Sequence, residues 1–399
     1  MTIRTLFAYL FGSRAAIEKF AVSRWSLPIG LLLVFSSGIA RYYDNAYLPA
    51  EWTVLLRGIA VSTINSFVLV VLAYCFAARG DVKAGFPRMY VSFLGLFWMM
   101  APMAWLYGIP YEHFLTPMGA VNANTWTLGL VSVWRVLLAA RVLSVLFGVS
   151  AFAMFFPVML FSDVAMWVAT QFAPRPVLDL MGGMQLTEVE RQISSSAMLV
   201  QAGTLLMIPL WAIATLVAAG FVEPKREQAA VGGAPIPKPN ALLALGAVAI
   251  CGWSVAAAVT QPALRLRHRA EELLQTGRVD DALMEMSTRN RSDYPPVWDA
   301  PPRRLFGEKF PPLQDIRLAM ERKWPVPWVA DMFMEKSWRD VASNLQAPVS
   351  EIEYLASMIE FSDSIDTEGL GFHLAHDKRF SEPDREKLRE AIARRKRPK

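Results

Sequence analysis

The chain has 399 residues, of which 54% are hydrophobic and 19% are charged, a balance that excludes ordinary soluble domains and predicts a membrane protein. Its two cysteines, Cys75 and Cys251, both lie in apolar stretches, which excludes a disulfide-stapled secreted scaffold. The net charge of +5 arises within residues 1–262, because acidic and basic side chains balance in residues 263–399. The excess therefore indicates membrane topology and lipid contact, and we expect no nucleic-acid partner.

Residues 1–24 are predicted to form an amphipathic helix that lies at the membrane interface. Arg4 and Arg14 fall off its apolar face, which consists of Ile3, Leu6, Phe7, Leu10 and Phe11. A cleaved signal peptide is the competing interpretation. It is disfavoured because a charged start, an apolar core and a small-residue cleavage site do not follow one another here.

Residues 25–262 are predicted to form an all-α, polytopic transmembrane helical bundle. A crossing helix needs about 20 apolar residues, and uncharged runs near that length are frequent in this region. The long stretch 126–170 is suited to two crossings with a turn near 148–150. Hydropathy therefore predicts seven spans, of which the others are 25–40, 58–78, 89–111, 192–222 and 239–264.

The distribution of Lys and Arg near the span ends places the N-terminus in the cytoplasm. Seven spans put the C-terminal domain on the opposite side of the membrane. A six-span alternative, in which 126–141 lie at the surface and 142–162 cross, fits the charge bias better and keeps that domain inside. The side of the C-terminal domain is therefore left open by the sequence.

Three charged residues, Arg135, Arg141 and Asp163, fall inside the predicted spans, and Arg141 is close enough to the turn for its side chain to reach the interface. Arg135 and Asp163 each lie 14 residues from a turn centred on Val149, which places both about 21 Å from the turn. Antiparallel neighbours would hold them at one depth, where an intramembrane ion pair is expected. Such a pair fixes helix register, or it serves as an ion or proton site.

A polar cluster occupies the second predicted span. It contains four polar side chains within five residues: Ser62, Thr63, Asn65 and Ser66. Hydrogen bonding to a neighbouring helix explains such a cluster, and a substrate site is the alternative.

Residues 263–399 are predicted to form a soluble all-α domain. The first part of this domain is predicted to form two helices joined by a tight turn at Gly277. A Pro-rich strip at 293–302 is expected to be extended, as a spacer or a docking strip. Further helical patterns occupy 313–323, 326–342, 349–362 and 383–396.

Residues with catalytic potential are few and scattered. Glu112 and His113 follow the third predicted span, and His373 and His376 form the one tight histidine pair. A membrane enzyme would require these groups to converge in one cavity. Known hydrolase, phosphate-binding and metal-binding motifs are absent from the sequence, so we expect no catalytic residue, no cofactor and no metal.

Several stretches of the chain resemble an uncharacterised family of bacterial multi-span inner-membrane proteins, some of which are loosely grouped as Yip1-like. The resemblance implies a bacterial inner-membrane location and assigns no chemistry. The stretches are Phe11-Gly-Ser-Arg-Ala-Ala-Ile17, Gly38-Ile-Ala-Arg-Tyr-Tyr-Asp44, Phe156-Pro-Val-Met-Leu-Phe-Ser-Asp163 and Asp293-Tyr-Pro-Pro-Val-Trp298.

The sequence therefore favours a non-enzymatic membrane anchor or scaffold. Its expected partners are the lipid bilayer and, through residues 263–399, another protein. The alternative is a transporter or channel that uses Arg135, Asp163 and the cluster from Ser62 to Ser66.

Overall fold

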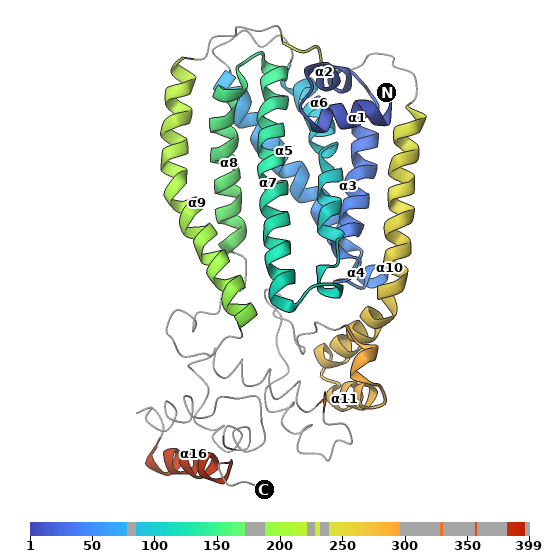
Figure 1. Ribbon diagram of the computed structural model, residues 1–399, viewed down its shortest axis with the longest axis vertical. Coiled ribbons are helices and arrows are strands. Elements are labelled where there is room, and N and C mark those ends of the chain that lie inside the picture. Colours follow the sequence, from blue (N-terminus) through green and yellow to red (C-terminus); the bar gives the residue numbers. More distant parts are fainter. Residues whose placement is uncertain are drawn as a thin grey trace. The chain divides into compact units, whose positions relative to one another are not determined.

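The computed structural model describes residues 1–77, 85–171, 188–221, 228–231, 239–295, 328–329, 356 and 381–395. Within these residues the regular secondary structure is helical, and no strand is present (Figure 1). Six of the described helices are long and apolar enough to cross a membrane. The predicted all-α fold, with a bundle of membrane-crossing helices, is therefore confirmed.

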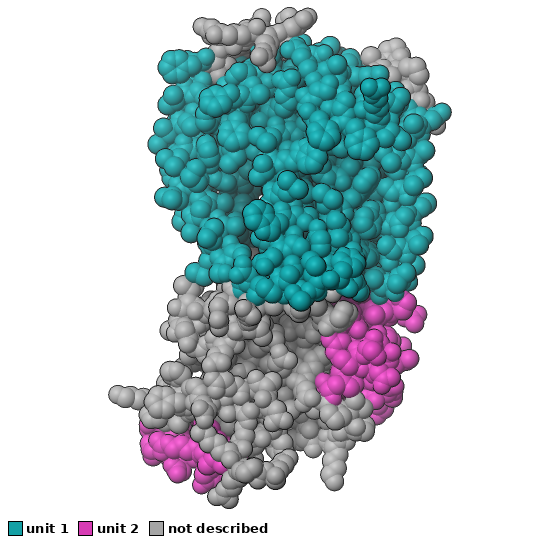
Figure 2. Space-filling view, viewed as in Figure 1, with its two compact units in different colours: residues 1–174, 188–261 teal, residues 175–187, 262–399 magenta. Residues whose placement is uncertain are grey.

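The chain divides into two units, which Figure 2 shows in teal and magenta. Unit 1 comprises Met1–Pro174 and Glu188–Gln261, and unit 2 comprises Arg175–Thr187 and Pro262–Lys399. The boundary after Gln261 lies next to the position at which the composition changes from apolar to charged.

Short elements connect the long helices of the bundle. Pro102 lies inside the crossing Phe86–Gly108, which changes there from α-helix to the 3₁₀-helix η1, because proline cannot donate the next backbone hydrogen bond. The connecting elements are α4 (Leu48–Glu51), η1 (Ala101–Gly108) and η2 (Tyr111–His113). The long helices are α3 (Ser26–Tyr42), α5 (Thr53–Ala77), α6 (Phe86–Trp98), α7 (Pro117–Phe147), α8 (Ala151–Gln171), α9 (Glu188–Gly220) and α10 (Asn240–Gln275).

The outer surface of the bundle is strongly apolar. On α9, the side chains of Leu199, Leu206 and Leu216 are each more than 70% exposed, at 75%, 72% and 74%. Exposure of this many leucine side chains to water would be unfavourable in free energy, whereas the acyl chains of lipids solvate them. The exposed face of α9 is therefore suited to a lipid environment.

The N-terminal segment forms two short helices instead of the single one predicted. α1 (Ile3–Leu10) and α2 (Arg14–Ala21) meet at Gly12, whose φ of +73° favours glycine. The apolar face predicted from the sequence is also divided. Leu6 is buried in the core, whereas Phe7 is 58% exposed. Periodicity alone missed the division because the apolar spacing continues through the turn.

Side chains of α1 and α7 fix the N-terminal helices to the bundle. The Tyr9 hydroxyl donates to a backbone carbonyl of α6 at 2.6 Å. From α7, the Trp134 indole donates to the carbonyl of Leu10 at 2.8 Å, and the Arg141 guanidinium donates to that of Gly12 at 3.1 Å. Arg141 thus ties α7 to the backbone of the α1–α2 turn.

Helices α3 and α6 cross closely through a pair of glycines. A Cβ at Gly30 would lie 2.8 Å from the Cβ of Trp98 and 3.0 Å from the carbonyl oxygen of Gly95. A Cβ at Gly95 would lie 3.1 Å from the backbone nitrogen of Leu27. These distances are below ordinary van der Waals contact, so the crossing requires glycine at both positions.

The predicted turn between α7 and α8 is present. Gly148 ends α7 with a φ of +68°, a left-handed conformation common at helix C-termini, and α8 begins at Ala151. Residues 126–141 lie inside α7, so they do not form the separate surface segment of the six-span alternative. The charge pattern suggested that segment because Arg135 and Arg141 interrupt the apolar run.

The two ends of α3 are held by different parts of unit 1. At its start, the Ser26 hydroxyl donates to a carbonyl of α2 at 2.5 Å. Beyond its end, the Gln261 amide donates to the carbonyls of Tyr43 and Ala46, both at 3.1 Å, and accepts from the N–H of Leu48 at 2.9 Å. Gln261 therefore lies beside the end of α3 that is opposite to the end contacted by α2. Figure 1 shows α1 and α2 at one end of α3 and α4 at the other.

Unit 2 contains the predicted helix–turn–helix. α10 ends at Gln275, Gly277 follows with a φ of +75°, and α11 (Val279–Ser287) packs Leu283 into a small buried cluster with Leu274. The last predicted helix is present as α16 (Glu382–Arg395).

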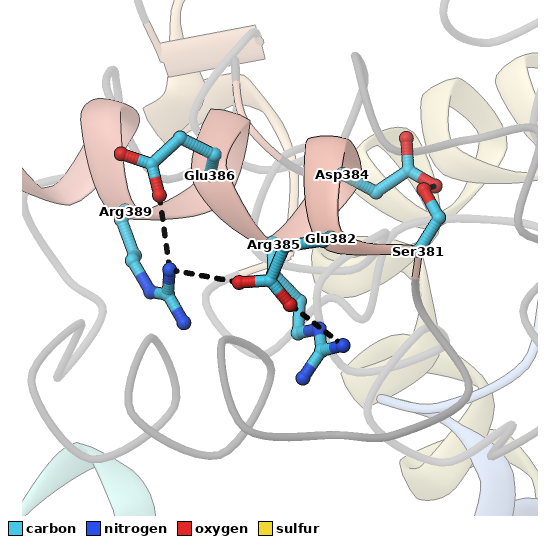
Figure 3. A network of polar contacts seen from close by, with 6 residues as sticks. All are labelled: Ser381, Glu382, Asp384, Arg385, Glu386 and Arg389. Carbon is cyan, nitrogen blue, oxygen red and sulfur yellow. Dashed lines mark hydrogen bonds and ion pairs between the residues drawn. The ribbon is translucent and has the colours of Figure 1, made fainter.

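The surface of α16 carries a chain of ion pairs within one helix (Figure 3). Arg389 contacts Glu386 at 2.9 Å and Glu382 at 3.3 Å, and Arg385 contacts Glu382 at 2.8 Å. Exposed pairs of this kind contribute little to stability, because water and salt screen the charges. Three sequence predictions, the helices 313–323, 326–342 and 349–362, lie outside the described residues except for 328–329 and 356, which are helical. Residues 296–302 of the Pro-rich strip also lie outside the described residues.

Candidate functional site

The polar cluster of α5 bonds mainly to its own helix. The hydroxyls of Ser62 and Thr63 donate to the carbonyl of Ile59 at 2.8 and 2.7 Å, and the buried Ser66 donates to the carbonyl of Thr63 at 2.8 Å. Asn65 is half-buried in the same turns. The donating hydrogens of these hydroxyls are therefore already used, which leaves little capacity for a substrate.

The same cluster also joins α5 to α6. The indole N–H of Trp98 donates to the Ser62 hydroxyl at 3.1 Å, and the hydroxyl of Tyr90 donates to the carbonyl of Thr63 at 3.3 Å. Both donors come from α6. The cluster therefore acts as interhelical hydrogen bonding, the first of the two interpretations offered by the sequence.

Arg135 lies in the middle part of the crossing helix α7 and is directed toward a ring of α6. Its guanidinium carbon is 5.7 Å from the ring centroid of Phe97, which occupies the midpoint of the crossing Phe86–Gly108. Inserting a charge at the centre of a membrane helix costs about 2.5–3.5 kcal/mol or more. A cation–π contact recovers only about 0.5–2 kcal/mol, so the ring alone does not balance the charge.

Asp163 faces a different neighbour. Its Oδ2 accepts a hydrogen bond from the indole N–H of Trp211, on α9, at 2.9 Å. The rings of Phe155 and Phe156 contact the same indole at centroid distances of 6.0 and 6.4 Å. The carboxylate is therefore half-buried at the α8–α9 interface with one indole donor.

The structure does not bring Arg135 and Asp163 together. The described residues contain no ion pair between them, because Arg135 contacts Phe97 whereas Asp163 contacts Trp211. Equal distance from the turn sets equal depth, but it does not set the direction in which each helix turns its side chains. The two residues occupy different helix interfaces.

Arg135 has Tyr107 of η1 and Arg41 of α3 within electrostatic range. Tyr107 is likewise within electrostatic range of both arginines and interacts with the Ser132 hydroxyl of α7. The fold brings these residues from three elements into one region, whereas the sequence singled out Arg135 alone.

The remaining sequence candidates do not form a catalytic group in the described part of the chain. His113 ends η2 and is exposed, and the side chain of Glu112 lies outside the described residues, as do His373 and His376. Among described residues, no group of three or more His, Cys, Asp or Glu side chains has metal-binding geometry. Neither a cofactor nor a substrate can be assigned from these groups.

The two intramembrane charges therefore have separate partners: Arg135 of α7 lies over the Phe97 ring, and the Asp163 carboxylate of α8 accepts a hydrogen bond from the Trp211 indole. Comparison with known proteins finds no protein-family model, no curated sequence and no solved structure that matches this chain.

Proposed function

We propose that this protein is a membrane anchor whose helical bundle carries a soluble helical domain for contact with another protein. The observation that supports the proposal most directly is the division of the chain. Unit 1 exposes apolar helices suited to lipid, whereas residues 263–399 are charge-balanced and polar. A transporter receives less support, because the α5 hydroxyls bond their own helix and Arg135 and Asp163 do not pair.

The cell membrane, in particular a bacterial inner membrane, is the proposed location, with the N-terminus in the cytoplasm. Counting α3 together with the six long apolar helices gives seven crossings among the described residues. With 17 residues, α3 has a length of about 25 Å, slightly less than the hydrocarbon thickness of about 30 Å. The opposite placement of Gln261 and the N-terminal helices supports an odd number of crossings. The C-terminal domain then lies on the side opposite the N-terminus.

Cysteine labelling tests this topology. In a variant without Cys75 and Cys251, we expect a membrane-impermeant thiol reagent to label Arg4→Cys from one side of sealed vesicles and Thr288→Cys from the other. Labelling of both positions from one side would contradict an odd number of crossings. Labelling after detergent treatment controls for the accessibility of each thiol.

The contact surface is tested by photo-crosslinking in intact membranes. Met284 is 62% exposed on α11, although its neighbours Leu283 and Met286 are buried. A crosslinking amino acid at position 284 is expected to give a discrete product with a second protein, whereas the exposed position Glu272 serves as a control. Absence of a product at 284, or equal products at both positions, would refute a contact through α11.

A further inference from the structure

The two N-terminal helices contact the long helices well inside one end of the bundle. Phe86 of α6 and Phe147 of α7 mark this end, because both rings contact that of Tyr74, at centroid distances of 5.4 and 6.2 Å. The Ser92 hydroxyl donates to the carbonyl of Ala21, the last residue of α2, at 3.0 Å. Ser92 follows the first residue of α6 by about 9 Å, and its side chain is short. The end of α2 therefore lies among the crossing helices, and Figure 1 shows α1 beside the upper part of α6.

The turn between α1 and α2 has its backbone groups satisfied within the protein. The N–H groups of Gly12 and Ser13 donate back to carbonyls of α1 at 2.8 and 2.9 Å. The carbonyl of Leu10 accepts from Trp134, and that of Gly12 accepts from Arg141. These two donors lie about 20 and about 9 Å along α7 from its last residue. Water would satisfy such carbonyls without help, whereas acyl chains cannot, so the bonds are suited to a turn at membrane depth.

Helix α1 has one side in the core and another side that faces outward. The outward side carries large apolar residues, because Ile3, Phe7 and Phe11 are 41%, 58% and 74% exposed. Their spacing of four residues places them on one face, which we call the outer face of α1. The opposite side joins the same buried cluster as the crossing helices through Leu6, Tyr9 and Leu10.

The outer face is continuous with the lipid-facing surface of α7. The ring of Phe11 contacts that of Trp134 at a centroid distance of 5.2 Å. Next to Trp134 on the surface of α7, Leu130 and Leu137 are each more than half exposed, at 60% and 54%. Because α7 is one of the helices long and apolar enough to cross a membrane, these leucines face acyl chains. The same acyl chains reach Phe11.

We propose that the α1–α2 hairpin is immersed in one leaflet, where the outer face of α1 binds the acyl chains of lipids. Two phenylalanine rings exposed to water on one short helix would be unfavourable, whereas acyl chains solvate them. Arg4 is exposed at the start of α1, from which its long side chain extends toward the head groups. The proposal goes further than the interfacial helix predicted from the sequence, because the bundle fixes the depth of the hairpin. It does not rest on the anchoring function, since it concerns unit 1 alone.

Spin labelling of the full-length protein in liposomes of phosphatidylcholine and phosphatidylglycerol tests the immersion. In a variant without Cys75 and Cys251, a nitroxide is attached to Phe7→Cys or Phe11→Cys. Its collision rates are measured with oxygen, which concentrates in hydrocarbon, and with a water-soluble nickel complex. Leu206→Cys on α9, where the side chain is 72% exposed, is the lipid-facing reference. Thr288→Cys, exposed in unit 2, is the aqueous reference.

We expect the ratio of oxygen to nickel collision rates at positions 7 and 11 to be within about threefold of that at position 206 and about tenfold or more above that at position 288. Where Phe11→Cys does not fold because it loses the contact with Trp134, Ile3→Cys replaces it. A ratio at positions 7 and 11 equal to that at position 288 would place the outer face in water and refute the immersion. Low collision rates with both reagents would mean that protein, such as a second copy of the chain, covers the outer face, and would refute its contact with acyl chains.

Discussion

The crossing of α3 and α6 offers the sharpest test of packing in the bundle. In Gly30→Ala the new Cβ would lie 2.8 Å from the Cβ of Trp98, whereas carbon atoms prefer about 3.5–4.0 Å. The carbonyl oxygen of Gly95 and the backbone nitrogen of Met99 would lie 3.0 and 3.5 Å from the same Cβ, so the clash involves the backbone of the neighbouring helix as well as a side chain. One of the helices must therefore move by up to about 1 Å. Overpacking of this kind costs about 1–3 kcal/mol.

A matched variant removes the effect of helix propensity. Gly203 lies in α9, and a Cβ there meets nothing within 4 Å, so Gly203→Ala gains about 0.8–1.0 kcal/mol without a clash. The same gain applies to Gly30→Ala. The difference in the free energy of unfolding between the two variants therefore isolates the clash, at about 1–3 kcal/mol.

Thermal unfolding in detergent, followed by tryptophan fluorescence, measures this difference. At about 2–4 °C per kcal/mol for a protein region of this size, Gly30→Ala is expected to unfold about 2–12 °C below Gly203→Ala. Gly95→Ala is expected to shift in the same direction, because its Cβ would lie 3.1 Å from a backbone nitrogen of α3. Equal midpoints for Gly30→Ala and Gly203→Ala would refute the close crossing.

Three further predictions concern other parts of the chain. Gln261→Leu removes three hydrogen bonds to the segment after α3 and is expected to lower the unfolding free energy by about 2–4 kcal/mol. Gln261→Glu is expected to lower it by less, because the carboxylate can still accept from the N–H of Leu48. An unchanged thermal midpoint in Gln261→Leu would contradict a stabilising role of these hydrogen bonds. The double variant Arg135→Asp/Asp163→Arg exchanges the two charges, and we expect it to be no more stable than the two single variants together predict, with a coupling energy below about 0.5 kcal/mol in a double-mutant cycle. Recovery of stability in the double variant would instead support the ion pair predicted from the sequence. Burial raises the pKa of the Tyr294 phenol to about 12 in the folded state, whereas the unfolded value is about 10. The stability that the protonated phenol contributes to unit 2 is therefore fully present below pH about 10 and is lost as the pH rises from about 10 to 12. The difference in ultraviolet absorbance between wild type and Tyr294→Phe measures that titration, and a midpoint near 10 would refute it.

Hydropathy located the crossing helices because each must satisfy its backbone hydrogen bonds internally and present apolar side chains to lipid. The turns at Gly148 and Gly277 were also predictable, since both positions adopt left-handed φ values that glycine tolerates. The division of the N-terminal segment at Gly12 was not, because an apolar spacing of 3.6 residues carries no information about a turn that preserves it.

The sequence by itself determined the class of protein and the approximate positions of its membrane-crossing helices. The direction of each side chain depended on tertiary structure, because the rotation of a helix about its axis is set by contacts with its neighbours. Arg135 and Asp163 are equally far from the α7–α8 turn in the sequence, yet Arg135 contacts Phe97 and Asp163 contacts Trp211. For the same reason Arg41 and Tyr107, distant from Arg135 in the chain, come within electrostatic range of it only in the folded bundle.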